Sequence, residues 1–199
     1  MRITLKLLVL LICIFSASAG AQEDKKNPPP PGADYTALQM TGLGQIDQII
    51  DPLRLRLHDG RIVQLSGIDI PDLTPYDTGE IGMAALEQLK QTLTGKHIRL
   101  YQSKNSSNGR RNRMGYQLAQ VEERNNGLWI QGMLLTGGLA RVRPSSLNTA
   151  MVSQMTALEQ EARSEQRGLW ANPQYAVLTP ETAAQGMNDW AIVEGTIHA

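Results

Sequence analysis

DGRIVQLSGIDIPD, residues 59–72, is the stretch of the sequence that decides the fold. Just before it, leucines alternate with polar residues across Leu53–His58, a period of two that is typical of a half-buried strand. Asp59-Gly60 then supplies the residues that a tight hairpin turn needs for positive φ. Ile62–Ile68 returns as a second strand, which Pro71 ends. The sequence therefore predicts a β-hairpin in this region.

The rest of the patterned sequence predicts a small barrel with helices at one side. Apolar residues recur at helical spacing over Glu80–Thr94, and Gly95 ends this helix. Beyond it we expect strands over His97–Gln102 and Tyr116–Val121, a short helix over Leu128–Thr136, and a longer helix that carries Met151, Met155, Leu158 and Ala162. Patterned sequence begins after Tyr35, so that with a strand ahead of the hairpin the order is three strands, one helix, two strands and two helices. It favours an α+β fold, a partly open five-stranded β-barrel of the OB type with three helices, over a βαβ layout.

The N-terminus has the layout of a secretory signal peptide, residues 1–21. Basic residues precede the apolar run Leu7–Phe15, and small residues follow up to Ala21. We expect cleavage after Ala19 or Ala21, and hence a periplasmic or secreted mature chain with no transmembrane segment. The only cysteine, Cys13, lies in this leader. The mature chain should therefore contain neither a disulfide nor a cysteine-ligated metal.

The remaining boundaries follow from composition. Residues 22–34 are charged and then rich in proline, which predicts an extended linker. Residues 35–172 contain the predicted barrel domain. Residues 173–199 form a C-terminal extension, in which WAIVEGTIHA (190–199) reads as a strand. That strand either adds to the barrel edge or begins a further unit.

Charge is balanced over the whole chain but not locally. The chain has 19 basic and 19 acidic residues, and loss of Arg2 and Lys6 with the leader leaves 17 against 19. This balance argues mildly against general nucleic-acid binding, which depends on phosphate neutralisation. Residues 90–113, however, contain seven Lys or Arg and no acidic residue. Four of these are candidates for a phosphate or polyanion contact: Lys104, Arg110, Arg111 and Arg113. A solvated basic surface is the alternative.

Five segments together resemble the staphylococcal nuclease-like, or thermonuclease, family. They are DGRIVQLSGIDIPD (59–72), IGMAAL (81–86), RMGYQLAQV (113–121), WIQGMLLTGGLARV (129–142) and LEQEARSEQRGLW (158–170). They follow the family's order and spacing. The resemblance implies an OB-type barrel and calcium-dependent hydrolysis of phosphodiester bonds in nucleic acids.

The resemblance also implies which positions form the site. Asp69 corresponds to a calcium-binding aspartate, and Asp72 stands where the family usually has a water-activating glutamate. The two arginines that stabilise charge on the phosphate correspond to Gln64 and Tyr116. The second calcium-binding aspartate corresponds to Leu53. The residues at these positions would accordingly provide only part of the ligands that a calcium ion has in the family.

These replacements lead to two functional hypotheses. The first is an exported binding or structural module with little remaining nuclease activity, whose groove contacts nucleic acid, another polyanion or a protein partner. The alternative is an active or weakly active calcium-dependent endonuclease, in which Arg111 or Arg113 substitutes for a missing arginine. Asp69 and Asp72 could also serve only to cap a turn, and Tyr116 could fill the space of the lost guanidinium.

Overall fold

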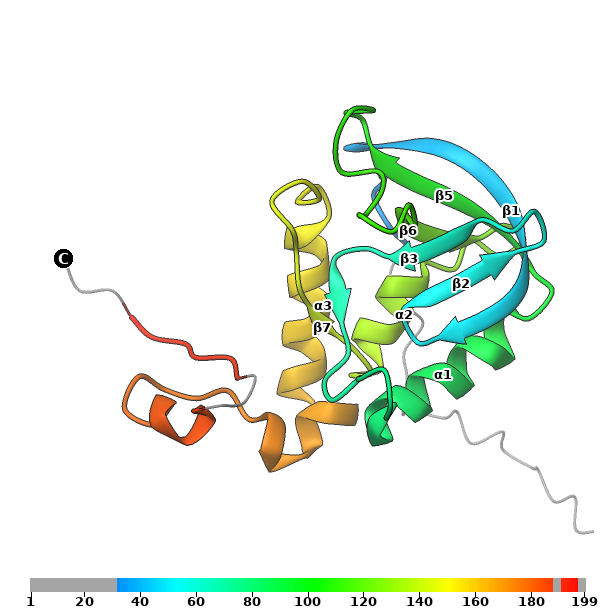
Figure 1. Cartoon of the computed structure of the whole chain (residues 1–199). Helices are drawn as coiled ribbons and strands as arrows, with labels where there is room; N and C mark the ends of the chain where they lie inside the picture. The colour runs from blue at the N-terminus through cyan, green and yellow to red at the C-terminus, as the bar shows by residue number, and fades with distance from the viewer. Residues whose placement is uncertain (1–31, 188–190, 197–199) are drawn as a thin grey trace, which may run out of the picture.

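A closed five-stranded barrel forms the centre of the molecule (Figure 1). The computed structural model describes residues 32–187 and 191–196. The barrel strands are β1 (Leu38–Asp51), β2 (Arg54–Leu57), β3 (Ile62–Leu65), β5 (His97–Ser103) and β6 (Gln117–Glu123). Neighbours pair in the order β1-β2-β3-β6-β5, and only β3 and β6 run parallel. The predicted α+β barrel is confirmed, although it is closed and not partly open.

Three α-helices cover the lower end and one side of the barrel in Figure 1. They are α1 (Gly79–Leu93), α2 (Ile130–Thr136) and α3 (Val152–Ser164), and three short 3-10 helices follow: η1 (Gly168–Ala171), η2 (Pro173–Tyr175) and η3 (Ala183–Gly186). The α1 helix buries Ala85, Leu89 and Leu93 on one face, as its apolar periodicity predicts. The α-helical segments predicted from the sequence are therefore confirmed.

The predicted hairpin exists, but its second strand is shorter than expected. Leu55, Leu57, Val63 and Leu65 are all buried, as the period of two requires. The chain then breaks at Gly67, which has a φ of +84° and lies so close to α3 that an added Cβ would be 2.6 Å from Met155 Cε. The prediction of one continuous strand over Ile62–Ile68 is wrong at this point.

The break at Gly67 creates a second, two-stranded sheet beside the barrel. It consists of β4 (Ile68–Asp69) and β7 (Arg141–Val142), which are antiparallel. Asp69 is paired in register with Arg141, and the backbone N–H of Arg143 donates to the Gly67 carbonyl at 2.8 Å. Two arginines from a distant part of the sequence are thereby brought to Asp69.

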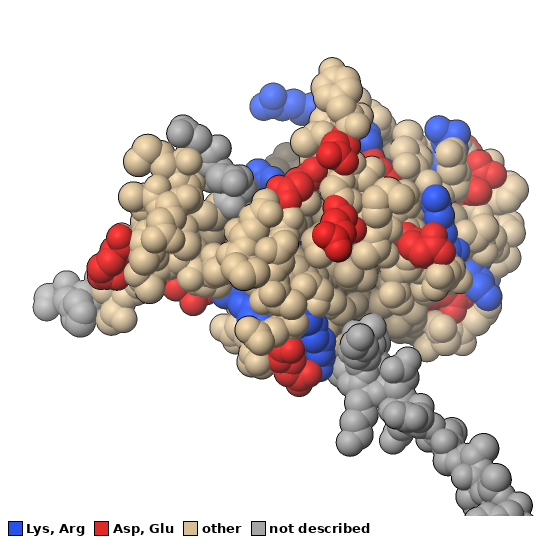
Figure 2. Space-filling model, turned by 90° about the horizontal axis from the view of Figure 1, so that it is seen from below, with Lys and Arg blue, Asp and Glu red and all other residues tan. Residues whose placement is uncertain are grey.

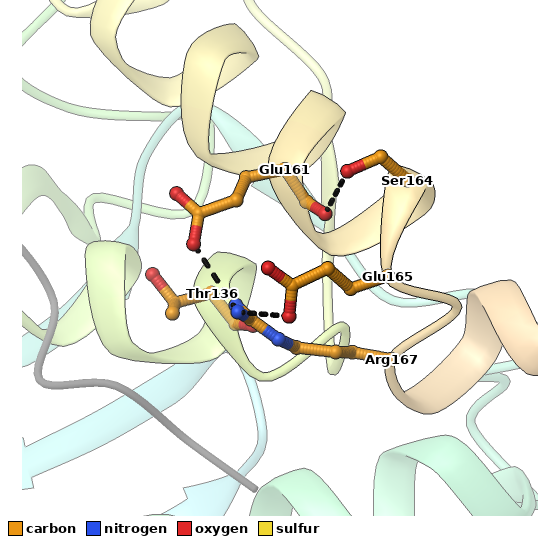
Figure 3. A network of polar contacts seen from close by, with 5 residues as sticks. All are labelled: Thr136, Glu161, Ser164, Glu165 and Arg167. Atoms are coloured by element: carbon orange, nitrogen blue, oxygen red, sulfur yellow. Dashed lines mark hydrogen bonds and ion pairs between the residues drawn. The ribbon is translucent and has the colours of Figure 1, made fainter. Parts of the chain in front are cut away.

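A polar network joins the ends of α2 and α3 (Figure 3). The Arg167 guanidinium donates to the Thr136 carbonyl at 3.0 Å and forms ion pairs with Glu161 at 3.2 Å and Glu165 at 2.5 Å. Directly beside it, an added Cβ on Gly138 would lie 2.1 Å from the Arg167 carbonyl oxygen. These contacts fix where the chain leaves α3 and enters its C-terminal extension.

The C-terminal extension packs back on the domain through a few contacts. The Glu194 carboxylate is 2.6 Å from the Arg163 guanidinium of α3, whereas the isolated parallel bridge between Val193 and Leu178 lies within the extension itself. Within 191–196, the described part of the expected strand 190–199, this bridge replaces a continuous strand. The predicted signal peptide and most of the linker lie in residues 1–31, outside the described residues. None of the described helices is long and apolar enough to cross a membrane.

Candidate functional site

Most of the family site positions meet in one groove on the barrel. Leu53, Gln64 and Tyr116 line a pocket of about 470 Å³. An adjoining pocket of about 340 Å³ shares Leu53 and Gln64 with the first and also contains Asp69 and Arg143. We call these two pockets together the barrel groove. The structure thus brings together four positions that the resemblance singled out.

Gln64 takes part in a neutral hydrogen-bond network. Its Oε1 accepts a hydrogen bond from Asn112 Nδ2 at 2.8 Å. The Oδ1 of Asn112 in turn accepts from the backbone N–H groups of Met114, at 2.9 Å, and Tyr116, at 3.0 Å. Gln64 therefore helps to hold the β5–β6 loop and brings no positive charge to the groove.

The entrance to β2 has Leu53 at the position where the resemblance implies a calcium-binding aspartate. Leu53 provides only an apolar side chain, and its backbone N–H donates to Asp51 Oδ1 at 2.9 Å. The other oxygen of Asp51 is ion-paired with Arg54. The hydrogen bond that the Arg54 guanidinium donates to Asp51 raises the pKa of Arg54. Asp51 therefore stabilises the turn between β1 and β2.

Asp69 is paired with two arginines of its own chain. The Arg143 guanidinium is 3.4 Å from Asp69 Oδ2 and the Arg141 guanidinium is 3.9 Å from it. The side chain of Arg143 is 63% exposed, whereas that of Arg141 is 4% exposed. Burial lowers the pKa of Arg141 to about 10, although Asp69, Asp72 and Glu159 act to raise it. Guanidinium groups thus supply the positive charge beside Asp69.

Asp72 faces the C-terminal extension. It has a φ of 61°, in the left-handed region that non-glycine residues rarely adopt. The hydroxyl of Tyr175, in η2, donates to Asp72 Oδ2. Burial and, after it, this hydrogen bond together raise the pKa of Tyr175 to about 12. Asp72 lies outside the lining of both pockets of the barrel groove.

The four predicted basic contacts all lie on the loop between β5 and β6. This loop is at the top of Figure 1, at the end of the barrel opposite α1. Figure 2 shows the molecule from below, where acidic side chains lie across the middle of the face and Lys and Arg lie mainly toward its edges. Lys104 and Arg113 are exposed. Arg110 and Arg111 line a third pocket.

The side chains at the site do not fit a calcium ion. Calcium takes six to eight oxygen ligands, usually with several carboxylates. The Leu53 side chain has no oxygen, Asp51 and Asp69 are ion-paired with guanidinium groups, and Asp72 bonds to Tyr175. Across the described residues, no group of three or more His, Cys, Asp or Glu side chains is placed to hold a metal.

The sequence pointed to Gln64, Asp69, Asp72 and Tyr116 but not to the residues that contact the two carboxylates. Arg141 and Arg143 form an alternating pair in GLARVRP, a pattern that only suggests a strand with two arginines on one face. Tyr175 lies 103 residues from Asp72. No local signal connects such distant positions.

Comparison with known families agrees with the barrel fold. No curated protein matches the sequence at a significant level. The model of the family described as staphylococcal nuclease homologue matches residues 62–172, which is more than half of the chain. The chain therefore belongs to the staphylococcal nuclease family.

Proposed function

We propose that this protein is an exported binding module that has lost efficient phosphodiester hydrolysis. The observation that carries this proposal is the ion pairing of Asp69 with Arg141 and Arg143. A carboxylate that is neutralised by fixed guanidinium groups has little electrostatic attraction left for a divalent cation. The proposal that the protein is exported rests on residues 1–21, which have the layout of a signal peptide.

The missing charges should have a large effect on the rate. Loss of one preorganised charge-stabilising donor typically costs about 3 to 4 kcal/mol of transition-state stabilisation. An arginine at a phosphoryl transition state contributes roughly 10³ to 10⁵ in rate. The losses at Gln64, Tyr116 and Leu53 need not add fully. Even a fraction of their sum would reduce cleavage to a trace.

Nucleic acid or a similar polyanion is the ligand that the surface favours. The β5–β6 loop supplies four basic side chains, and the barrel groove offers apolar and aromatic surface at Leu73, Met114 and Tyr116. Single strands bind to such combinations because the backbone meets positive charge while bases stack on aromatic rings. A protein partner in the groove is the other outcome that the test below can reveal.

Fluorescent single-stranded DNA and RNA, incubated with the mature protein in calcium or in chelator, would test the proposal. We expect binding in both buffers and cleavage in neither. Chelator-sensitive cleavage that disappears in Asp69→Ala and Asp69→Asn would overturn the loss of hydrolysis and favour the endonuclease alternative. Absence of any oligonucleotide binding would leave the protein partner as the ligand.

A further inference from the structure

A separate polar pocket lies between the β5–β6 loop, β1 and the segment after β7. Its volume is about 450 Å³, and its lining includes Thr41, Gln102, Ser107, Arg110, Arg111 and Gln117. It shares no lining residue with the barrel groove. We call it the loop pocket.

The loop pocket has positive charge and no compensating carboxylate. Arg110 donates from Nε to the Ser103 carbonyl at 2.8 Å and from a terminal nitrogen to Gln39 Oε1 at 2.7 Å. Arg111 donates to the Gly115 carbonyl at 2.7 Å. All of these acceptors are neutral, so none of these bonds places a carboxylate against either guanidinium. No acidic side chain is among the residues that line the pocket.

The walls of the loop pocket are held in place before any ligand arrives. Gln102, which is 5% exposed, donates to the carbonyls of Arg110 at 2.8 Å and Leu118 at 2.9 Å. Thr41 donates to Gln102 Oε1 at 2.8 Å. At Gly109, which has a φ of +78°, an added Cβ would lie 2.7 Å from the Leu147 carbonyl oxygen. A fixed site loses less conformational entropy when a ligand binds.

We propose that the loop pocket binds the phosphate group of a polar ligand of about nucleotide size. Guanidinium groups attract phosphate and form charge-assisted hydrogen bonds with its oxygens, and the hydroxyl and amide side chains of the lining can supply further hydrogen bonds. The volume is in the range of small-molecule sites, and the polar lining disfavours an apolar ligand. This inference deepens the polyanion contact and rests on that part of the proposed function, but not on the loss of hydrolysis.

Titration calorimetry with adenosine 5′-monophosphate, adenosine and inorganic phosphate would test the pocket, at low and at moderate salt. We expect the nucleotide to bind at least about tenfold more tightly than adenosine, because charge-assisted hydrogen bonds are stronger than neutral ones. Arg111→Gln should weaken nucleotide binding by about tenfold or more, the expected consequence of losing such a contact. Ser107→Asp, which places a carboxylate on an exposed part of the lining, should have a similar effect without disturbing the fold.

Arg56→Gln is the matched control, because Arg56 is an exposed arginine on β2 that lines neither the loop pocket nor the barrel groove. We expect its affinity for the nucleotide to stay within about twofold of the wild type, the range of exposed charges. Equal weakening in Arg56→Gln and Arg111→Gln would mean diffuse surface attraction and would overturn the proposal. So would unchanged binding in both Arg111→Gln and Ser107→Asp.

Binding of oligonucleotides would test the loop pocket separately from the proposed function. It would also show whether the phosphate belongs to a strand end or to a mononucleotide. A preference for 5′-phosphorylated strands over 5′-hydroxyl strands, lost in Ser107→Asp, would identify a strand end as the source. Strand binding without any mononucleotide binding would overturn the loop pocket but leave the proposed function standing. Loss of both kinds of binding in the wild type would overturn both.

Discussion

The carboxylate of Asp69 has a different task here from the one that its position suggests. In a partly buried site it needs a positive partner, because an unpaired charge away from water is costly. Arg141 and Arg143 supply that partner within the chain. The same pairing removes the need for a metal ion in the folded state.

The two arginines should contribute very unequally to stability. Arg141→Met should lower the free energy of unfolding by about 1–3 kcal/mol, because it removes a buried donor that faces Asp69. Arg143→Ala should change it by less than about 0.5 kcal/mol, because the Arg143 side chain is 63% exposed. Urea unfolding at neutral pH would measure both, and equal losses would contradict the larger contribution expected of the buried Arg141.

Single residues were predictable from the sequence where local pattern decides them. Gly60 at the hairpin turn has the expected positive φ, and the leucines of β2 are buried as their alternation requires. The partners of Asp69 and Asp72 were not predictable. Arg143 is 74 residues away from Asp69 along the chain, and only the tertiary fold joins them.

At the scale of elements, the break between β3 and β4 determines the site. Gly67 turns the chain out of the barrel, and β4 then pairs with β7 instead of a barrel strand. Apolar residues recur through residues 62–68, and a single continuous strand would give the same pattern. The close approach of Met155 to Gly67 is a contact of the folded state, so the break has no local signature beyond the glycine itself.

The η2 helix should make stability depend on alkaline pH. The pKa of Tyr175 is raised to about 12 in the folded state, so the stabilisation from its hydrogen bond to Asp72 is complete below the ordinary value of 10. It should be lost as the pH rises through about 12. Tyr175→Phe should therefore be less stable than the wild type at pH 8, and the difference should shrink above pH 11.

Chemical denaturation of both proteins at the two pH values would measure this difference. Tyr76→Phe is the matched control, because Tyr76 is 99% exposed and its loss should have no comparable pH dependence. A Tyr175→Phe difference that stays constant with pH would show that the hydroxyl contributes through packing and not through its bond to Asp72.

At the scale of the whole molecule, the barrel is kept while the distribution of charge over the site is changed. The family match covers residues 62–172, but the groove is lined by Leu53, Gln64 and Tyr116, at the positions where the resemblance implies a carboxylate and two arginines. The retained carboxylates have in turn acquired partners from β7 and from the C-terminal extension. Restoring catalysis should therefore require changes at both sets of positions.

A comparison of two restored variants would test this dependence. The first carries Leu53→Asp, Gln64→Arg and Tyr116→Arg, and the second adds Arg143→Ala and Tyr175→Phe. We expect the first to cleave single-stranded DNA only weakly in calcium, because Asp69 and Asp72 keep their present partners. The second should cleave at least about tenfold faster, since Asp69 then keeps only Arg141 as a partner and Asp72 loses its bond to Tyr175, so that both carboxylates attract the cation more strongly. Equal rates would show that the internal partners do not limit the site. If neither variant cleaved or bound calcium while both kept wild-type circular dichroism, the assignment of the three substituted positions would be wrong.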